Sequence, residues 1–347
     1  MFKAGFSIYT GLDDYPLKRN LEYLELASSL GYEFIFSSAH INEATDAFDE
    51  LQTIVTEAHK KGIKLILDVS KPMMDRFKMP ENLYSLRLDY GFTKEDIVEL
   101  SKTSKCKIEL NASTLSKKEI EELISKGLNT ENVRTSFNFY PKLYTGHSID
   151  LVKEKLELFK SYNMSTLIFI PSKVGKRPPM YEGLPSIEKH RYMNLDVVIE
   201  ELKSLGVDEI AFGDAYASFQ ELELLKSHQV EHMILPFKKV SGVSDDIISS
   251  LTNIFRVRPD YNNYMLRCSG SRGVKEIEPF NTVERHFGDV TIDNSGFKRY
   301  KGEINIVTCD LPQDARVNVI GHVELTTDMI EALKKGQRYT FGVSSND

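Results

Sequence analysis

The chain has 347 residues, more than a typical single domain, and this length favours two domains, the larger with a substantial core. Its 51 acidic residues outnumber the 44 basic ones, and no long basic cluster occurs, so nucleic acid is not an expected partner. There is no signal-peptide pattern and no run of about twenty apolar residues, and three widely spaced cysteines suit a reducing compartment. We therefore expect a cytoplasmic protein without a membrane partner.

The first two thirds of the chain alternate short apolar segments with amphipathic ones, which predicts strands that alternate with helices. The expected strands are residues 5–9, 33–37, 63–69, 83–89, 106–111, 133–139, 166–170 and 209–213. The expected helices are residues 13–30, 46–61, 116–127, 149–162 and 194–205, with two more that begin at residues 93 and 218.

Helix-start signals support these boundaries. Thr93 and Ser116 each stand three residues before an acidic residue, which is the spacing of a capping box. Asp13 and Asp14 precede Pro16, so we also expect a carboxylate cap on the first helix.

Eight strand and helix units in roughly 230 residues match a (β/α)₈ barrel better than a six-stranded doubly wound sheet. After this region, short apolar runs are broken by Gly, Asn, Asp and Pro, which indicates a smaller β-rich domain. The predicted fold class is thus α/β, with a TIM barrel over residues 1–232 and a β-rich domain over residues 233–347.

Polar residues alternate with apolar ones near the carboxyl ends of the predicted strands. Arg87 and Asp89 share one face of their strand, and Glu109 and Asn111 share one face of the next. Strands separated by helices are parallel and covered on both faces, and barrel enzymes keep their chemistry at this end. The same pattern adds Asp68, Asn138, Tyr140 and Asp214.

Several carboxylates without a nearby nucleophilic Ser or Cys constellation suggest proton transfer or glycosidic chemistry. Neighbouring strands lie about 4.8 Å apart, so Asp89 and Glu109 would have the spacing of a retaining pair, about 5 to 5.5 Å. Asp68 and Glu109, two strands apart, would lie near 9 to 10 Å, at or just beyond the inverting range. The sequence leaves this choice open, and Asp68 could instead form a buried structural ion pair with Arg87.

A basic insert over residues 171–191 follows the seventh predicted strand and contains Lys173, His190 and Arg191. Barrels often hold a phosphate in the loops after strands seven and eight, and the alternative is a solvated surface loop. Tyr140 and Tyr144 precede it in a loop that could pack on sugar rings or cap the core. No metal-binding spacing and no glycine-rich nucleotide fingerprint occurs, so we expect neither a metal nor another cofactor.

Several short segments are distinctive in combination. They are residues 68–69 (Asp-Val), 86–89 (Leu-Arg-Leu-Asp), 107–111 (Lys-Ile-Glu-Leu-Asn), 138–141 (Asn-Phe-Tyr-Pro), 144–146 (Tyr-Thr-Gly), 182–185 (Glu-Gly-Leu-Pro), 188–191 (Glu-Lys-His-Arg), 213–218 (Gly-Asp-Ala-Tyr-Ala-Ser) and 295–303. Together they resemble a bacterial family of 6-phospho-N-acetylmuramidases, once labelled outer surface proteins. The resemblance runs along the whole chain.

This resemblance implies a barrel followed by a cyclophilin-like β domain. It also implies hydrolysis of the β-1,4 bond of 6-phospho-N-acetylmuramyl-N-acetylglucosamine in peptidoglycan recycling. With the strand pattern, it makes Glu109 and Asp89 the expected catalytic pair and Asp68 the third candidate. The expected substrate-binding residues are Arg87, Asn111, Asn138, Tyr140, Tyr144 and Asp214, with Lys173, His190 and Arg191 for the 6-phosphate.

Other interpretations remain open at this point. Relatives can carry Asn in place of Asp214, which favours a substrate contact over a catalytic role there, and the 2-acetamido group of the substrate could replace an enzyme nucleophile. A divalent-metal-dependent sugar isomerase or aldolase could use Asp68, Asp89, Glu109 and a histidine as ligands. A non-catalytic carbohydrate-binding protein could use the same fold, and a homo-oligomer is possible.

Overall fold

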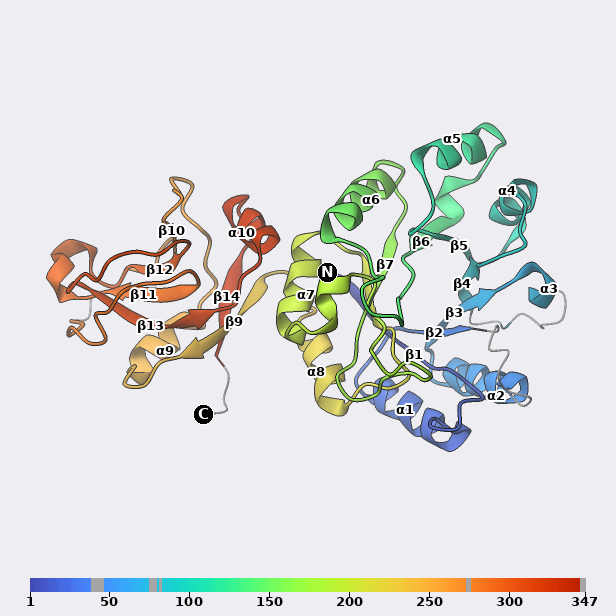
Figure 1. Ribbon diagram of the computed structural model, residues 1–347, viewed down its shortest axis with the longest axis horizontal. Helices are drawn as coiled ribbons and strands as arrows, with labels where there is room; N and C mark the ends of the chain where they lie inside the picture. Colours follow the sequence, from blue (N-terminus) through green and yellow to red (C-terminus); the bar gives the residue numbers. More distant parts are fainter. Residues whose placement is uncertain (39–46, 75–79, 81–82, 273–275, 344–347) are drawn as a thin grey trace. The chain divides into compact units, whose positions relative to one another are not determined.

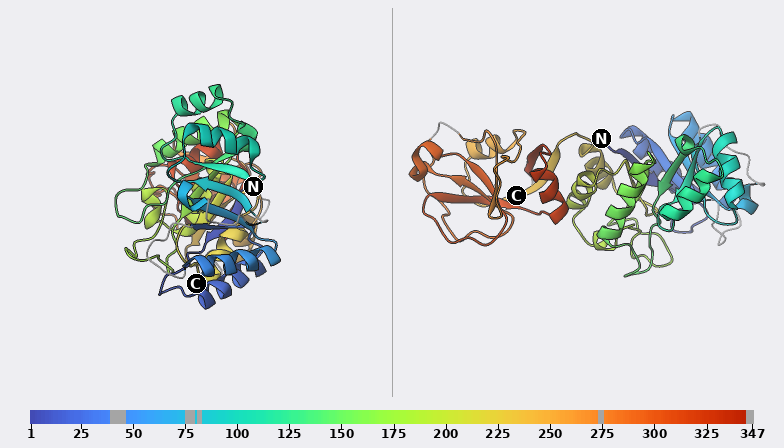
Figure 2. Two further views of the ribbon diagram at one scale, coloured as in Figure 1. Left: turned by 90° about the vertical axis from the view of Figure 1, so that its right-hand side faces the viewer. Right: turned by 90° about the horizontal axis from the view of Figure 1, so that it is seen from above.

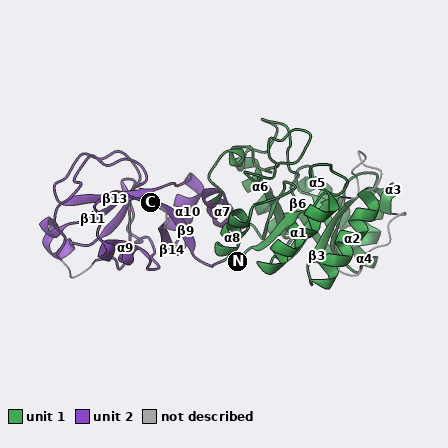
Figure 3. Cartoon of the chain, turned by 90° about the horizontal axis from the view of Figure 1, so that it is seen from below, with its two compact units in different colours: residues 1–195, 206–229 green, residues 196–205, 230–347 purple. Residues whose placement is uncertain are grey.

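The computed structural model describes residues 1–38, 47–74, 80, 83–272 and 276–343 (Figure 1). The chain divides into two compact units (Figure 3). One unit contains residues 1–195 and 206–229, and the other contains residues 196–205 and 230–347.

Eight parallel strands form a closed barrel in chain order, which confirms the predicted fold class. The strands are β1 (Lys3–Ser7), β2 (Phe34–Ser38), β3 (Lys64–Val69), β4 (Leu83–Leu88), β5 (Lys107–Asn111), β6 (Val133–Ser136), β7 (Thr166–Ile170) and β8 (Glu209–Phe212). Figure 2 shows the helices outside the strands of the barrel. Strands β3 to β8 begin within a residue or two of the expected positions.

The helices of this region cover strands that are buried on both faces, as a parallel barrel requires. They are α1 (Leu17–Ser29), α2 (Ala47–Lys60), α3 (Lys71–Met74), α4 (Lys94–Thr103), α5 (Lys117–Ser125), α6 (Ile149–Ser161) and α8 (Phe219–Ser227), with the short 3₁₀ turns η1 (Thr130–Asn132) and η2 (Glu188–Arg191). Helix α7 (Leu195–Ser204), between β7 and β8 in the chain, falls almost wholly within the other unit. None of the described helices has the length and apolar character needed to cross a membrane.

The helix starts confirm part of the capping analysis. Thr93 and Ser116 form complete capping boxes at the starts of α4 and α5. The expected carboxylate cap on α1 is wrong, because Pro16 is the N-cap residue and no side chain caps this helix. Proline fixes the backbone for the first turn without a side-chain acceptor.

The interior of the barrel has an apolar half and a polar half. Phe36 from β2 and Phe169 from β7 meet edge to face with ring centroids 5.0 Å apart. Phe139, which follows β6, packs edge to face on both rings. The interior side chains of β3 to β6 are instead mostly charged or polar, so this half of the barrel carries the candidate chemistry.

The second unit is built on a mixed six-stranded sheet in the order β10-β12-β11-β13-β9-β14. Its elements are β9 (Met233–Lys239), α9 (Asp245–Leu251), β10 (Met265–Arg267), β11 (Asp289–Asp293), η3 (Ser295–Tyr300), β12 (Ile304–Val307), β13 (Val317–Val323), α10 (Thr327–Lys334) and β14 (Tyr339–Val343). Only β14 and β9 pair in parallel; the other pairs in this sheet are antiparallel. This agrees with the predicted small β-rich domain.

Candidate active site

A group of polar side chains meets at the carboxyl ends of β3, β4 and β6. Arg87 is its centre, since its Nη1 donates to Asp68 Oδ1 at 2.6 Å and its Nη2 donates to Asn138 Oδ1 at 2.5 Å. Ser136 accepts a third bond from Arg87 Nε at 3.0 Å. Asp68 and Arg87 are direct neighbours in the register of β3 and β4, so the strand alternation itself brings them together.

Asp89 completes this group from the residue after β4. Its Oδ1 lies 3.7 Å from Arg87 Nη1, the same atom that binds Asp68, so the two carboxylates are neighbours around one guanidinium. The side chain of Asp89 is 39% exposed, whereas that of Asp68 is 11% exposed. We call Asp68, Arg87, Asp89 and Asn138 the carboxyl-end network.

The guanidinium of Arg87 is positively charged in this network. Burial alone lowers its pKa, but Asp68, Glu109 and Asp89 outweigh burial and raise the pKa above its ordinary value. The guanidinium therefore fixes the positions of Asp68 and Asn138 and supplies compensating charge to two carboxylates. The ion pair between Asp68 and Arg87, which the sequence analysis left as an alternative, is present.

Glu109 belongs to a second group that lies toward the amino ends of the strands. Its Oε2 accepts from Ser85 Oγ at 2.8 Å and lies 3.0 Å from Arg134 Nε. Arg134 also binds Glu209 at the start of β8, and Tyr84 donates to the other oxygen of Glu209 at 2.7 Å. We call Glu109, Arg134, Glu209 and Tyr84 the amino-end network.

The three charged residues of the amino-end network are closed to solvent, whereas Tyr84 is partly buried. Glu109 is 0% exposed, and Arg134 and Glu209 are each 1% exposed. Burial alone lowers the pKa of Arg134, but Glu109 and Glu209 outweigh it and raise the pKa. Glu109 Oε1 has no hydrogen-bond partner among the described residues, but the surrounding side chains enclose it. Glu109 thus lies next to Arg87 in register, but its carboxylate turns to Arg134.

Aromatic and amide side chains also lie at the end of β5 and in the loop after β6. Asn111 ends β5, and its Oδ1 accepts from the backbone N–H of Ser113 at 3.0 Å. Tyr140 bonds His147 Nε2 through its hydroxyl at 2.9 Å, and its ring meets the imidazole edge to face. Tyr144 is 86% exposed, which leaves its ring available to a ligand.

Arg191 of the basic insert has a structural arrangement that the sequence did not indicate. It forms a two-bond ion pair with Glu188, and its remaining N–H groups donate to backbone carbonyls of residues 140, 142, 182 and 183. Glu188 in turn accepts from the backbone of Tyr144 and Gly146, and the Arg191 bonds hold the pKa of Glu188 at about 2. Arg191 therefore joins two loops and has no donor left for a phosphate.

His190 and Asp214 are also enclosed. His190 is fully buried, so it does not face a ligand in this structure. Asp214 accepts three backbone N–H groups of the insert, from Ser172, Leu184 and Arg177, at 2.8 to 3.2 Å. Burial raises the pKa of Asp214 to about 6, although these bonds and Lys176 act in the opposite direction. Asp214 therefore stabilises the conformation of the insert. A direct contact with a sugar, as the sequence analysis expected, is not compatible with this burial.

The insert does form a basic pocket with the loop after β1. The pocket has a volume of about 430 Å³. Its lining residues are Asp14, Tyr15, Arg19, Lys173, Val174, Lys176 and Tyr181. Three cations against one carboxylate favour an anionic ligand such as a phosphate. Of the three residues expected to select a phosphate, the structure places Lys173 there.

Two parts of this arrangement were missed in the sequence. Arg134, Ser136 and Asn138 alternate along β6 in the same way as the recognised polar pairs, so this signal was present and could have identified Arg134. Arg19 had no such signal, because it is a basic residue in a helix, where charged side chains are common. Among the described residues, no group of three or more His, Cys, Asp or Glu side chains is arranged to hold a metal ion.

Comparisons with known proteins agree along the whole chain. The model of the 6-phospho-N-acetylmuramidase N-terminal domain matches residues 4–227, and that of the C-terminal domain matches residues 233–342. A crystal structure of an uncharacterized B. cereus protein is 25% identical with a TM-score of 0.88, and the match covers 99% of this chain and 100% of that one. A conserved Enterococcus faecalis protein of unknown function is also 25% identical, with a TM-score of 0.72 and coverage of 99% and 97%. No curated protein matches.

Proposed function

Because the chain belongs to the 6-phospho-N-acetylmuramidase family, we propose that it hydrolyses the β-1,4 bond of 6-phospho-N-acetylmuramyl-N-acetylglucosamine. The observation that carries the site assignment is the pair of neighbouring carboxylates around Arg87, at the end of the barrel where such enzymes act. One of these carboxylates is buried and the other is open to solvent. Most glycosidases use two carboxyl groups with different roles at the same bond.

We assign the proton donor to Asp89. Its side chain is the most exposed of the three candidates, and its contact with Arg87 is the longer one. A bound sugar would cover it beside Asp68, which would place a carboxyl group at the oxygen of the leaving sugar. Asp89 would then protonate the oxygen of the leaving N-acetylglucosamine as its bond to the anomeric carbon breaks, which releases that sugar with a free hydroxyl group. A water molecule would add to the anomeric carbon of the 6-phospho-N-acetylmuramyl residue and return a proton to Asp89.

Asp68 would supply the negative charge that faces the developing oxocarbenium ion. Arg87 and Ser38 hold its two oxygens, at 2.6 and 3.1 Å, so the carboxylate is oriented before substrate binds. Arg87 is a positioning residue in this scheme. Phe139 and the exposed Tyr144 offer apolar surface to the sugar rings, and Asn138 offers its amide.

The basic pocket would receive the 6-phosphate. Lys173 and Lys176 from the insert after β7 and Arg19 from the first turn of α1 supply three positive charges. Charge-assisted hydrogen bonds from such groups are stronger than neutral ones. This assignment replaces Arg191 and His190, because their polar groups are enclosed.

The test is a product assay by mass spectrometry with the purified chain. The disaccharide is supplied in its 6-phosphorylated and unphosphorylated forms, with and without a metal chelator. We expect cleavage of the phosphorylated form, little cleavage of the other, and no effect of the chelator. Loss of activity with the chelator would support the isomerase or aldolase interpretation, and tight sugar binding without any cleavage would support a carbohydrate-binding protein.

A further inference from the structure

The central strands of the second unit have one apolar face and one polar face. Leu266, Val290 and Ile306 lie on the apolar face and are fully buried. On the other face, Asn305 of β12 pairs with Arg267 of β10 on one side and with Thr291 of β11 on the other. These three polar residues form one row across three neighbouring strands.

A pocket of about 340 Å³ lies over this polar row. This volume is at the lower end of the range for small-molecule sites, about 300 to 1,000 Å³. Met265, Phe297 and Val317 add apolar surface to its wall. Thr291 and Asn305 are only 2% and 4% exposed, so the polar groups at the base are shielded and the pocket is distinct from an ordinary solvated sheet face.

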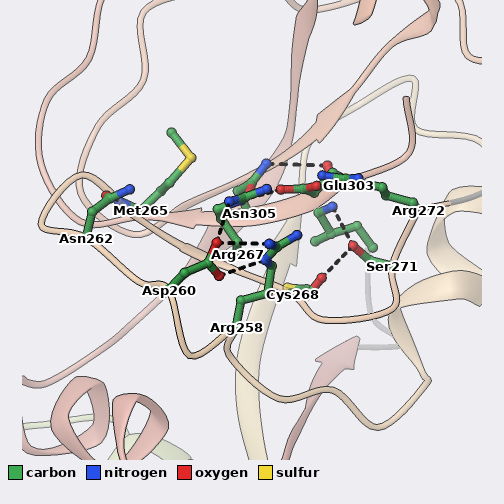
Figure 4. Close-up of polar contacts among 11 residues, drawn as sticks. Arg258, Asp260, Asn262, Met265, Arg267, Cys268, Ser271, Arg272, Glu303 and Asn305 are labelled. Carbon is green, nitrogen blue, oxygen red and sulfur yellow. Dashed lines mark hydrogen bonds and ion pairs between the residues drawn. The ribbon is translucent and has the colours of Figure 1, made fainter. Parts of the chain in front are cut away.

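The charged side chains of this pocket balance one another. Its lining contains three arginines, Arg267, Arg272 and Arg285, and three acidic residues, Asp293, Glu303 and Asp314. Figure 4 shows Arg267 and Arg272 turned toward Glu303, and each donates its Nε to one of the two Glu303 oxygens. The lining charges therefore nearly offset one another, with a small positive excess when Asp293 is protonated.

Two groups in the pocket retain unused hydrogen-bonding capacity. Asn305 Oδ1 is buried and has no hydrogen-bond partner among the described residues. Leaving such an acceptor unpaired destabilises the folded chain, and a ligand that donates to it would remove this cost. Asp293 lies in the same lining. Burial, Glu303 and Asp314 raise the pKa of Asp293 to about 7, so its carboxyl group can both donate and accept near neutral pH.

We propose that this pocket binds a neutral monosaccharide. A sugar hydroxyl both donates and accepts hydrogen bonds, so one ring can bond Asn305, Asp293 and those arginine N–H groups that have no acceptor among the described residues. Asp293 and Glu303 disfavour a phosphate or carboxylate ligand, and the three arginines disfavour a cation. The polar row disfavours an apolar ligand, because it would leave Asn305 unpaired. This assignment does not depend on hydrolysis by the barrel.

The test is isothermal titration calorimetry on the full chain. N-acetylglucosamine and glucose are the neutral probes, and inorganic phosphate and acetate are the anionic ones. Asn305→Leu and Thr291→Val remove polar groups from the row while nearly preserving shape. Arg338→Gln is the control, because Arg338 forms an exposed ion pair with Glu231 in the same unit and does not line the pocket. Thermal unfolding shows that each variant is folded.

We expect at least one neutral sugar to bind, with an affinity about tenfold weaker in Asn305→Leu and in Thr291→Val, as the loss of one hydrogen bond predicts. Arg338→Gln should bind as the unchanged chain does. Binding that is equal in all variants would place the sugar elsewhere and overturn the proposal. Binding of phosphate or acetate that is lost in the row variants would also overturn it, as would no binding of either neutral sugar. The calorimetry measures binding only and does not depend on hydrolysis of the disaccharide, so this proposal and the proposed function can fail separately.

Discussion

The carboxyl-end and amino-end networks of the barrel use the same kinds of residue and differ in access to solvent. Each joins two carboxylates through one arginine, Arg87 in the first and Arg134 in the second. In the amino-end network both carboxylates are sealed, whereas Asp89 of the carboxyl-end network is 39% exposed.

We infer from this difference that the amino-end charges are structural and that the carboxyl-end charges are the ones a substrate can reach. A sealed ion pair contributes little net stability, but removal of one partner leaves a buried charge without compensation. An exposed carboxylate beside a buried one can meet a substrate and can change its protonation state when the substrate covers it. Residue type and strand alternation are therefore insufficient to identify a catalytic group, and the direction in which its carboxylate turns decides its role.

The largest expected effect comes from breaking the amino-end network. Arg134→Met should lower the free energy of unfolding by about 3 to 5 kcal/mol, because Glu109 and Glu209 lose their shared cation in a closed interior. Denaturant titration measures it. Arg338→Met, which breaks an exposed pair, is the control and should cost less than about 1 kcal/mol. A small loss in Arg134→Met would show that the network is not a tightly coupled buried group.

Breaking the carboxyl-end network should affect activity more than stability. Asp89→Asn should lower kcat for the phosphorylated disaccharide by about 10² to 10⁴-fold, as expected for loss of a general acid. The melting temperature should change little, because the side chain is partly exposed. Asp150→Asn, at the exposed start of α6, is the matched control and should keep full activity. Full activity in Asp89→Asn would remove Asp89 from the mechanism.

Asp214 is a third kind of buried carboxylate in the barrel, because backbone N–H groups bind it where an arginine binds the others. Its pKa is raised to about 6, so the folded chain holds this proton more tightly than the unfolded chain does. Its stabilising contribution is complete below the unfolded pKa of about 3.9 and is lost as the pH rises through 6. The free energy of unfolding, taken relative to Asp214→Asn, should fall by on the order of 2 to 3 kcal/mol between pH 4 and pH 7. A pH-independent difference would contradict this.

The smallest expected effect concerns the basic pocket, which lies outside both networks. Lys176→Gln should raise KM for the phosphorylated disaccharide about tenfold with little change in kcat, because it removes a charge-assisted contact that is the same in ground and transition states. Lys189→Gln, in the same insert but outside the pocket, is the control. An unchanged KM in Lys176→Gln would place the phosphate elsewhere.

The sequence predicted the barrel because strand and helix periodicity and local capping act over a few residues. Thr93 and Ser116 illustrate this, since each capping box is complete within four residues. The predicted pairing of Asp68 with Arg87 succeeded for a related reason, because adjacent parallel strands and a shared face bring the two side chains together.

Other features depend on side-chain directions and long-range contacts. Glu109 is the register neighbour of Arg87 on the adjacent strand. Its carboxylate nevertheless contacts Arg134 on the next strand and is directed away from the carboxyl-end network. The sequence predicted Arg191 as a phosphate ligand, but its guanidinium bonds Glu188 and four backbone carbonyls instead. The polar row of the second unit joins residues from strands that are up to 38 positions apart, which no local pattern reveals.

The most direct test of the account compares Asp89→Asn and Glu109→Gln in one assay. The measurement is kcat for the phosphorylated disaccharide, corrected for the folded fraction of each variant. The account predicts a loss of at least about 10²-fold in Asp89→Asn and a loss of less than tenfold in Glu109→Gln, whose main effect is lower stability. The reverse order would contradict the account, since it would place catalysis on the carboxylate of the amino-end network.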